Sequence, residues 1–126
     1  MNTINKFLID SSKANPEKIA LIDENSEFTF SELEEKVMKF SSFLNQFEEK
    51  SVISLLFENT SEFVISYLSI INSGCVAHLI PTGISQHNLQ NQVSSAEPKL
   101  ALTSNSYFER IENIELENLE KLRFSD

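Results

Sequence analysis

The chain has 126 residues, of which 40% are hydrophobic, and carries a formal net charge of −9. This length corresponds to one domain or to part of a larger one, and the apolar share is sufficient for a packed core. The acidic balance argues against nucleic acid and anionic membranes as partners, because phosphates attract clustered Lys and Arg, which this sequence lacks.

The first part of the chain has the pattern of a helix followed by a hairpin. Apolar residues at helical spacing predict a short helix over residues 2–13. Pro16 ends this helix, since proline has no backbone N–H to donate. Residues 19–22 and 28–30 predict two strands joined by a short polar turn, as in a β-hairpin.

A second and clearer helix is expected to begin at Ser31. Ser31 and Glu34 have the spacing of a capping box, in which each side chain accepts a hydrogen bond from a free backbone N–H group. The apolar residues that follow recur on one stripe of the helix, while the charged residues lie outside it. The stripe comprises Leu33, Val37, Phe40, Leu44 and Phe47.

The middle of the chain alternates apolar strands with helical patterns. Strands are predicted over residues 52–57, 75–80 and 99–103, each apolar enough to be buried on both faces. One helix lies in each interval, and Gly74 suits the left-handed position that ends the first of them. This order predicts an α/β fold: a parallel βαβαβ unit with helices on both faces, beside the N-terminal helix and β-hairpin. The remaining residues predict a further helix and a strand.

Few residues suggest chemistry by themselves. Cys75, His78 and His87 are close in sequence, but positions i and i+3 of a strand point to opposite faces, which argues against a metal site. A nucleophilic role for Cys75 would need a positioned base and an electropositive surrounding, and the sequence indicates neither. Ser41 and Ser42, inside the second helix, indicate close packing against a neighbouring element.

The acidic residues and the glycines point to no ion or phosphate site. The acidic groups have the pattern of solvated helix faces; they are Glu32, Glu34, Glu35, Glu48 and Glu49. Gly74 and Gly83 are the only glycines, so a loop of backbone N–H groups that cradles a phosphate is not expected. No catalytic, cofactor-binding or metal-binding residue is therefore assigned. One cysteine, and no pattern of a signal peptide or membrane span, favour a cytoplasmic location.

Five stretches, in order and at suitable intervals, resemble the acyl- and amino-acid-adenylating superfamily of AMP-forming enzymes. FTFSEL at residues 28–33 is similar to the first core motif of that superfamily, and INSGCVAHLIP at residues 71–81 to the second. LLFENTSEFV at residues 55–64 resembles the strand, turn and helix between the two motifs. NPEKIALI at residues 15–22 resembles the usual lead-in, and AEPKLAL at residues 96–102 the strand after the second motif.

The resemblance implies that residues 1–126 are an N-terminal subdomain fragment of an AMP-dependent synthetase or ligase. Such enzymes use ATP and Mg²⁺ to convert a carboxylic acid into an acyl-adenylate. A thiol then takes the acyl group, either that of coenzyme A or the pantetheine of a carrier protein. The phosphate loop and the catalytic residues come later in the family's chain, so the resemblance implies a scaffold that is inactive alone and carries no cofactor. The remainder of the parent chain is its expected partner, with self-association through surfaces left uncovered.

The sequence departs from the family pattern at two places. Lys50 and Ser51 stand where the family usually has Gly-Asp before a strand. Thr82 and Gly83 stand where many coenzyme A ligases have an arginine that helps hold the nucleotide of coenzyme A, which counts against coenzyme A as the acceptor.

Two other functions remain open. The chain could be a stand-alone, non-catalytic α/β module for protein interaction, or an unrelated small Rossmann-like regulator. Continuation of the gene into a Ser/Thr/Gly-rich loop favours the enzyme, whereas a stop codon favours the module. A fold without the parallel βαβαβ arrangement would favour neither the enzyme nor the module.

Overall fold

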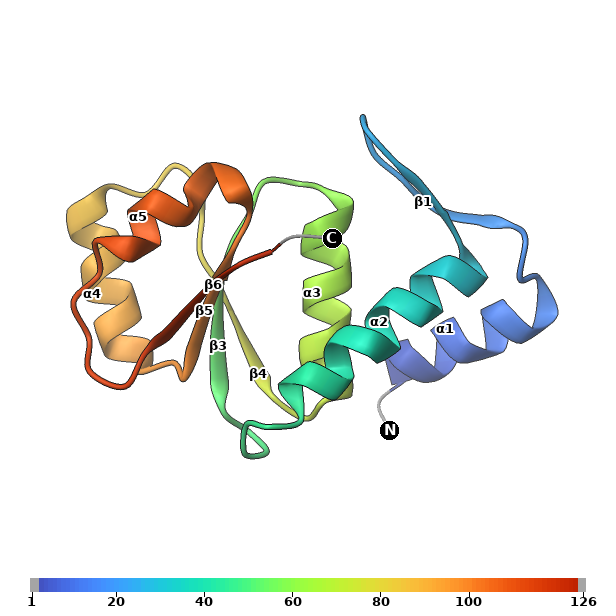
Figure 1. Ribbon diagram of the computed structural model, residues 1–126, viewed down its shortest axis with the longest axis horizontal. Helices are drawn as coiled ribbons and strands as arrows, with labels where there is room; N and C mark the ends of the chain where they lie inside the picture. Colours follow the sequence, from blue (N-terminus) through green and yellow to red (C-terminus); the bar gives the residue numbers. More distant parts are fainter. Residues whose placement is uncertain (1–2, 125–126) are drawn as a thin grey trace.

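The computed structural model of the chain describes residues 3–124 and shows an α/β fold (Figure 1). In chain order the elements are α1 (Thr3–Ala14), β1 (Ile19–Ile22), β2 (Glu27–Thr29), α2 (Phe30–Leu44), β3 (Val52–Leu56), α3 (Ser61–Asn72), β4 (Val76–Leu79), α4 (Gln86–Ala96), β5 (Leu100–Thr103), the 3-10 turn η1 (Asn105–Tyr107), α5 (Phe108–Glu112) and β6 (Glu120–Arg123). Strands β1 and β2 form an antiparallel hairpin, and the other strands form a parallel sheet in the order β4-β3-β5-β6. The predicted fold class is confirmed, and β6 adds a fourth strand to the expected three. Of the predicted terminal segments, residues 2, 125 and 126 lie outside the described range.

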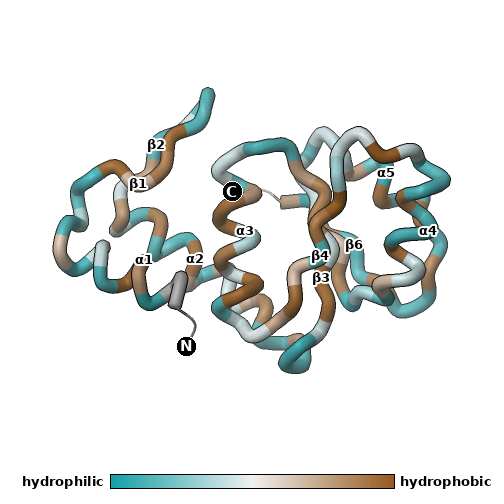
Figure 2. Tube along the Cα trace, turned by 180° about the vertical axis from the view of Figure 1, so that it is seen from behind, coloured by the Kyte–Doolittle hydropathy of each residue, from teal (hydrophilic) through white to brown (hydrophobic). Residues whose placement is uncertain are grey.

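The parallel sheet has a core on each face. Helices α2 and α3 cover one face and α4 and α5 the other, while α1 and the hairpin lie beyond α2 and α3 (Figure 1). Hydrophobic residues follow the central strands, and much of α4 is hydrophilic (Figure 2). The core on the α2/α3 face contains Leu44, Ile53, Leu55, Phe57, Ile70, Cys75, Leu100 and Leu102. The core on the α4/α5 face contains Leu56, Ile80, Leu89, Val93, Ala101, Ile111 and Ile114.

Strand β4 is not the fully buried strand that its sequence predicts. It lies at the edge of the sheet, paired only with β3, and Val76 and Leu79 are 47% and 51% exposed. The prediction failed because an apolar run indicates that both faces of a strand are apolar, but not whether a neighbouring strand flanks it.

The capping box of α2 begins two residues before the predicted one. Thr29 is the N-cap: its Oγ1 accepts from the Glu32 backbone N–H at 3.1 Å, and Glu32 Oε1 accepts from the Thr29 N–H at 2.9 Å. Both Thr29–Glu32 and Ser31–Glu34 fit the capping-box spacing, so the pattern alone could not separate them. In the structure Thr29 has the extended backbone of a cap, because it still pairs with Ile19 in the hairpin.

The expected close packing at Ser41 is present, between α2 and α3. Ser41 is buried, its hydroxyl donates to the Ser69 carbonyl at 3.4 Å, and the Asn72 amide donates to Ser41 Oγ at 3.0 Å. The Ser69 hydroxyl in turn lies 3.2 Å from the Val37 carbonyl. Ser42 is exposed and bonds only within α2, to the Met38 carbonyl, so the packing prediction was wrong for Ser42.

Two residues near the start of the sheet have left-handed backbone conformations. Gly74 has φ of 81° and follows α3, as predicted. Lys50 has φ of 69°, and its N–H donates to the Gly74 carbonyl at 2.8 Å. A left-handed residue therefore occupies the position where the adenylating superfamily usually has glycine, which explains why glycine suits that position.

Candidate functional site

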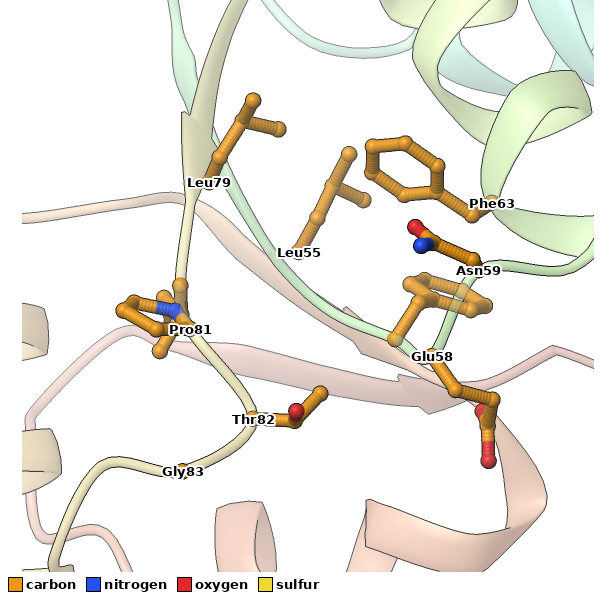
Figure 3. Close-up of a pocket in the computed structure, with 10 residues that line it drawn as sticks. Leu55, Glu58, Asn59, Phe63, Leu79, Pro81, Thr82 and Gly83 are labelled. Carbon is orange, nitrogen blue, oxygen red and sulfur yellow. The ribbon is translucent and has the colours of Figure 1, made fainter.

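A cleft lies at the carboxyl edge of the parallel sheet, where β3 and β4 end. In open α/β sheets ligands bind at this edge, because the loops after parallel strands meet there. The cleft has a volume of about 570 Å³. Pro81 and Thr82 face Asn59 and Glu58 across it, with Leu55 at the sheet side (Figure 3). The full lining is Leu55, Phe57, Glu58, Asn59, Phe63, Leu79, Ile80, Pro81, Thr82 and Gly83.

Side-chain oxygens at this edge lack hydrogen-bond partners. Oε1 of Glu58 is buried without a partner, and so are the hydroxyl oxygens of Thr103 and Ser104 at the end of β5. The register pairs Leu56 with Thr103, so the ends of β3 and β5 lie side by side. Buried polar atoms are nearly always hydrogen-bonded in folded proteins. Three of the four buried side-chain atoms without a partner in residues 3–124 therefore lie at this edge of the sheet, and the fourth is Oγ of Ser66 in α3.

Arg110 of α5 holds the loop that forms one wall of the cleft. Its guanidinium donates to the carbonyl of Thr82 at 3.1 Å, to the carbonyl of Ile84, and to Oε1 of Gln86 at 3.4 Å. The Gln86 amide donates back to the Arg110 carbonyl at 2.8 Å. A planar guanidinium with several fixed donors is suited to joining two backbone segments. Arg110 is therefore a positioning residue for the β4–α4 loop.

Asp23 holds the hairpin against the start of α3, on the other side of the cleft. Its carboxylate accepts from the backbone N–H groups of Asn25, Ser26 and Ser61 at 3.0, 2.9 and 2.8 Å. The hydrogen bonds from Ser61, followed by those from Asn25 and Ser26, hold the pKa of Asp23 well below its usual range. Thr60 caps α3 by accepting from the Phe63 N–H at 3.4 Å.

The residues considered for metal binding do not converge. Cys75 is packed in the core on the α2/α3 face, whereas His78 lies near α4 on the other face. Nδ1 of His78 is 2.7 Å from the hydroxyl oxygen of the buried Ser54, and burial lowers the pKa of His78. His87 is exposed on α4, where its Nε2 is 3.3 Å from the Asn91 amide. Within residues 3–124 no group of three or more His, Cys, Asp and Glu could hold a metal ion.

The acidic residues noted in the sequence perform structural tasks or face solvent. Glu32 completes the cap of α2, and Glu35 and Glu48 are exposed. The side chain of Glu49 packs over Gly74, so that a Cβ added at Gly74 would lie 3.0 Å from Glu49 Cγ. Glu34 is partly buried, on the same helix.

Sequence reasoning missed the residues of the cleft and its supports. Glu58 and Asn59 directly follow one apolar strand, and Thr82 and Gly83 follow the next. Because carboxyl ends of parallel strands share one edge, these positions could have been grouped from the predicted βαβαβ order. The Arg110 contacts had no such signal, since they depend on how α5 packs against a loop about 26 residues earlier.

A second hollow, of about 330 Å³, lies between α2 and β6 and is mostly apolar. Its walls include Phe40 and Phe43 of α2 and Leu122 and Phe124 of the edge strand and its end, with Lys36 and Lys39 among the lining residues. The Phe40 and Phe124 rings meet edge to face with centroids 5.9 Å apart. We refer to this hollow as the α2–β6 groove.

The parallel sheet, with helices on both faces and a cleft at its carboxyl edge, defines an α/β protein. Residues 8–125 match the family described as AMP-binding enzyme, and the chain therefore belongs to that family. This confirms the resemblance seen in the sequence motifs.

Two curated relatives are synthetases. Vanchrobactin synthetase VabF from Vibrio anguillarum is 25% identical over 112 residues, which is 87% of this chain and 4% of that protein. Beauvericin nonribosomal cyclodepsipeptide synthetase from Gibberella fujikuroi is 25% identical over 114 residues, 88% of this chain and 4% of the relative.

Solved structures share the fold. O-succinylbenzoate coenzyme A synthetase (MenE) from Bacillus subtilis, in complex with AMP, superposes with a TM-score of 0.76 at 24% identity, over 93% of this chain and 30% of that one. A putative long-chain-fatty-acid CoA ligase from Rhodopseudomonas palustris gives a TM-score of 0.90 at 11% identity, over 99% of this chain and 33% of that one. The chain thus spans about a third of these structures and 4% of each of the two curated synthetases.

Proposed function

We propose that this chain is the first part of the large N-terminal domain of an ATP-dependent, carboxylate-activating ligase. Membership of the AMP-binding enzyme family is the observation that carries the proposal, together with the fraction of each relative that the chain spans. In the proposed role this part supplies scaffold, and later segments of a parent chain supply the groups that bind ATP and Mg²⁺. The proposed location is cytoplasmic. Among residues 3–124 no helix has the length and apolar character needed to cross a membrane.

The chemistry of the cleft supports the scaffold role. Catalysis of adenylate formation requires charge neutralisation and positioning of phosphates by cationic groups, metal ions or backbone N–H groups. The lining of the cleft contains the carboxylate of Glu58 and no lysine or arginine. The guanidinium of Arg110 already binds the carbonyls of Thr82 and Ile84.

Carrier-protein pantetheine is the acceptor that we propose for the parent enzyme, rather than coenzyme A. Thr82 and Gly83 stand where many coenzyme A ligases have an arginine, and they lie beside the carboxylate of Glu58. An acidic lining repels the phosphates of a nucleotide. One of the two curated relatives, a nonribosomal cyclodepsipeptide synthetase, is consistent with this acceptor.

Pyrophosphate release measures the predicted inactivity directly. The chain alone, with ATP, Mg²⁺ and a panel of carboxylic and amino acids, should release no more pyrophosphate than a reaction without protein. A longer product of the same gene, if the reading frame continues past Asp126, serves as the positive control. Clear turnover by the chain alone would refute the scaffold role.

The exposed apolar surfaces favour a role in interaction as the second candidate. The α2–β6 groove and the edge strand β4 offer surfaces that the rest of a parent chain or a separate protein could cover. Sequencing the gene beyond the codon for Asp126 distinguishes the ligase fragment from a stand-alone interaction module. A reading frame that continues into a Ser/Thr/Gly-rich loop supports the ligase, and a stop codon supports the module.

A further inference from the structure

Strand β6 forms one edge of the parallel sheet, and half of its main-chain groups face outward. Among residues 3–124 it pairs with β5 alone. The N–H groups of Glu120 and Phe124 donate to carbonyls of the neighbouring segment, residues 99–103, at 3.1 and 2.8 Å. Because alternate residues of a strand bond to the same side, Lys121 and Arg123 present their N–H and C=O groups to the open edge.

The side chains of β6 and its end divide into an apolar face and a cationic face. Leu122 and Phe124 pack against the core on the α2/α3 face. On the opposite face the Lys121 ammonium donates to two carbonyls at and just beyond the end of α5, at 3.0 and 2.7 Å. The Arg123 guanidinium lies over the Phe108 ring, 5.1 Å from its centroid. A strand added at this edge therefore meets hydrocarbon on one face and two cations on the other.

The α2–β6 groove extends the apolar face beyond the edge of the sheet. Its volume is about 330 Å³, and Phe40 and Phe43 of α2 form the wall opposite the end of β6. Phe43 is 38% exposed. Lys36 and Lys39 lie on the same stripe of α2, and the described lining contains no Asp or Glu. The groove therefore suits the apolar side chains of an added strand that also carries negative charge.

Charge disfavours a second copy of β6 as the added strand. In an antiparallel pair, as in a two-fold symmetric dimer, residues whose main-chain groups face the partner lie opposite one another. Pairing of β6 with itself therefore places Lys121 or Arg123 opposite one of the same two cations of the other copy. Like charges directly opposite destabilise a strand pair, whereas acidic residues at these positions stabilise it.

We infer that the open edge of β6 binds an extended segment of a partner protein in which acidic and apolar residues alternate. The main chain of the segment pairs with the outward groups of Lys121 and Arg123, as in strand addition at other sheet edges. Its acidic side chains lie on the face of these two cations, and its apolar side chains enter the α2–β6 groove. This inference concerns the chain itself and does not depend on the proposed ligase function of a longer protein.

Titration of the ¹⁵N-labelled chain with N-acetylated, C-amidated peptides at constant ionic strength tests the partner chemistry. The peptide EVEVEV should shift the amide resonances of Lys121 and Arg123 in a saturable manner, because these amides gain hydrogen bonds. KVKVKV has the opposite charge, EEEVVV has the same composition without alternation, and LEKLRF copies residues 119–124; none of the three should do so. Saturable shifts of the two amides by any of them, at or below the concentrations needed for EVEVEV, would overturn the inference, as would no saturable response to EVEVEV.

Arg123→Glu tests the residue, with Lys13→Glu in the exposed last turn of α1 as a control that makes the same change in charge. A carboxylate opposite an acidic residue of the peptide should weaken EVEVEV binding by about fivefold or more in Arg123→Glu. Lys13→Glu should bind as the unmodified chain does. Equal affinities of the two variants would contradict the assignment. If Arg123→Glu does not fold, the comparison of the four peptides on the unmodified chain still decides.

Discussion

The backbone of Lys50 is left-handed, with φ of 69°, although it carries a side chain. Such a conformation costs a residue with a Cβ about 1–2 kcal/mol, and glycine avoids most of this cost. We therefore predict that Lys50→Gly stabilises the chain by about 0.5–1 kcal/mol, less than the full cost because glycine also gains freedom in the unfolded state. Urea denaturation monitored by circular dichroism measures the change.

The matched control for Lys50→Gly is Lys39→Gly. Lys39 is an exposed residue inside α2, where glycine should destabilise by about 1 kcal/mol. If both substitutions lower the urea midpoint to the same extent, the backbone angle at Lys50 does not limit stability.

Asp23 should make the stability of the folded chain depend on pH in the acidic range. Its pKa is lowered in the folded state by hydrogen bonds from Ser61, Asn25 and Ser26. A lowered carboxyl pKa contributes stability above the unfolded pKa of about 4, and this contribution is lost as pH falls below that value. Asp23→Asn should therefore lower the melting temperature at pH 7, and the gap to the unmodified chain should narrow at pH 3. Glu24→Gln, at an exposed neighbour, should leave the melting temperature nearly unchanged at both pH values.

His78 should cause a second pH dependence, in a higher range. Burial lowers its pKa, and its Nδ1 lies 2.7 Å from Ser54 Oγ. A histidine whose folded pKa is lowered contributes stability above about pH 6.5, which is lost as pH falls toward the folded pKa. The urea midpoint should fall between pH 7.5 and 5.5, and His78→Asn should reduce this fall. His87→Asn, on the exposed face of α4, should not; equal effects of the two substitutions would exclude His78 as the cause.

At the scale of elements, the edge position of β4 has a consequence for association. Val76 and Leu79 are about half exposed on a strand with one unpaired edge, a combination that invites pairing between chains. We expect the average mass in light scattering to rise with concentration. Combined Val76→Lys and Leu79→Lys substitutions should keep the chain monomeric, because charges on edge strands oppose pairing.

Ile22→Lys is the control for this association. Ile22 is 64% exposed but belongs to the hairpin, outside the parallel sheet. It should therefore not change the association. If the unmodified chain stays strictly monomeric at high concentration, β4 does not mediate association between chains.

The order and type of the elements could be predicted because their signals are local. Ile19–Ile22, the stripe of α2 and Gly74 after α3 follow from apolar spacing and backbone preference. The edge position of β4 could not, because strand order is set by non-local pairing. The shifted cap at Thr29 depended on the pairing of Thr29 with Ile19, which the local pattern does not contain.

The cleft at the carboxyl edge of the sheet was less predictable than the fold, because it also depends on contacts between segments far apart in the chain. The sequence showed polar residues after two strands, but their grouping into one cleft required the parallel sheet. The contacts of Arg110 with Thr82 and Ile84 and of Asp23 with Ser61 join segments far apart in the chain. Such contacts leave no periodic signal.

At the scale of the whole molecule, the chain is proposed to be scaffold of an AMP-binding enzyme. The sheet, its two cores and the cleft are built from residues 3–124, and the cleft lining is acidic and apolar. Groups that neutralise a triphosphate are proposed to lie in other parts of a parent chain. ATP should accordingly find no specific site on the chain alone.

Isothermal titration calorimetry of the chain with ATP and Mg²⁺ tests this claim most directly. We predict no saturable heat beyond dilution, at protein concentrations where micromolar binding would be detected. Saturable heat on addition of ATP and Mg²⁺, with an affinity higher than that for inorganic phosphate, would contradict the account.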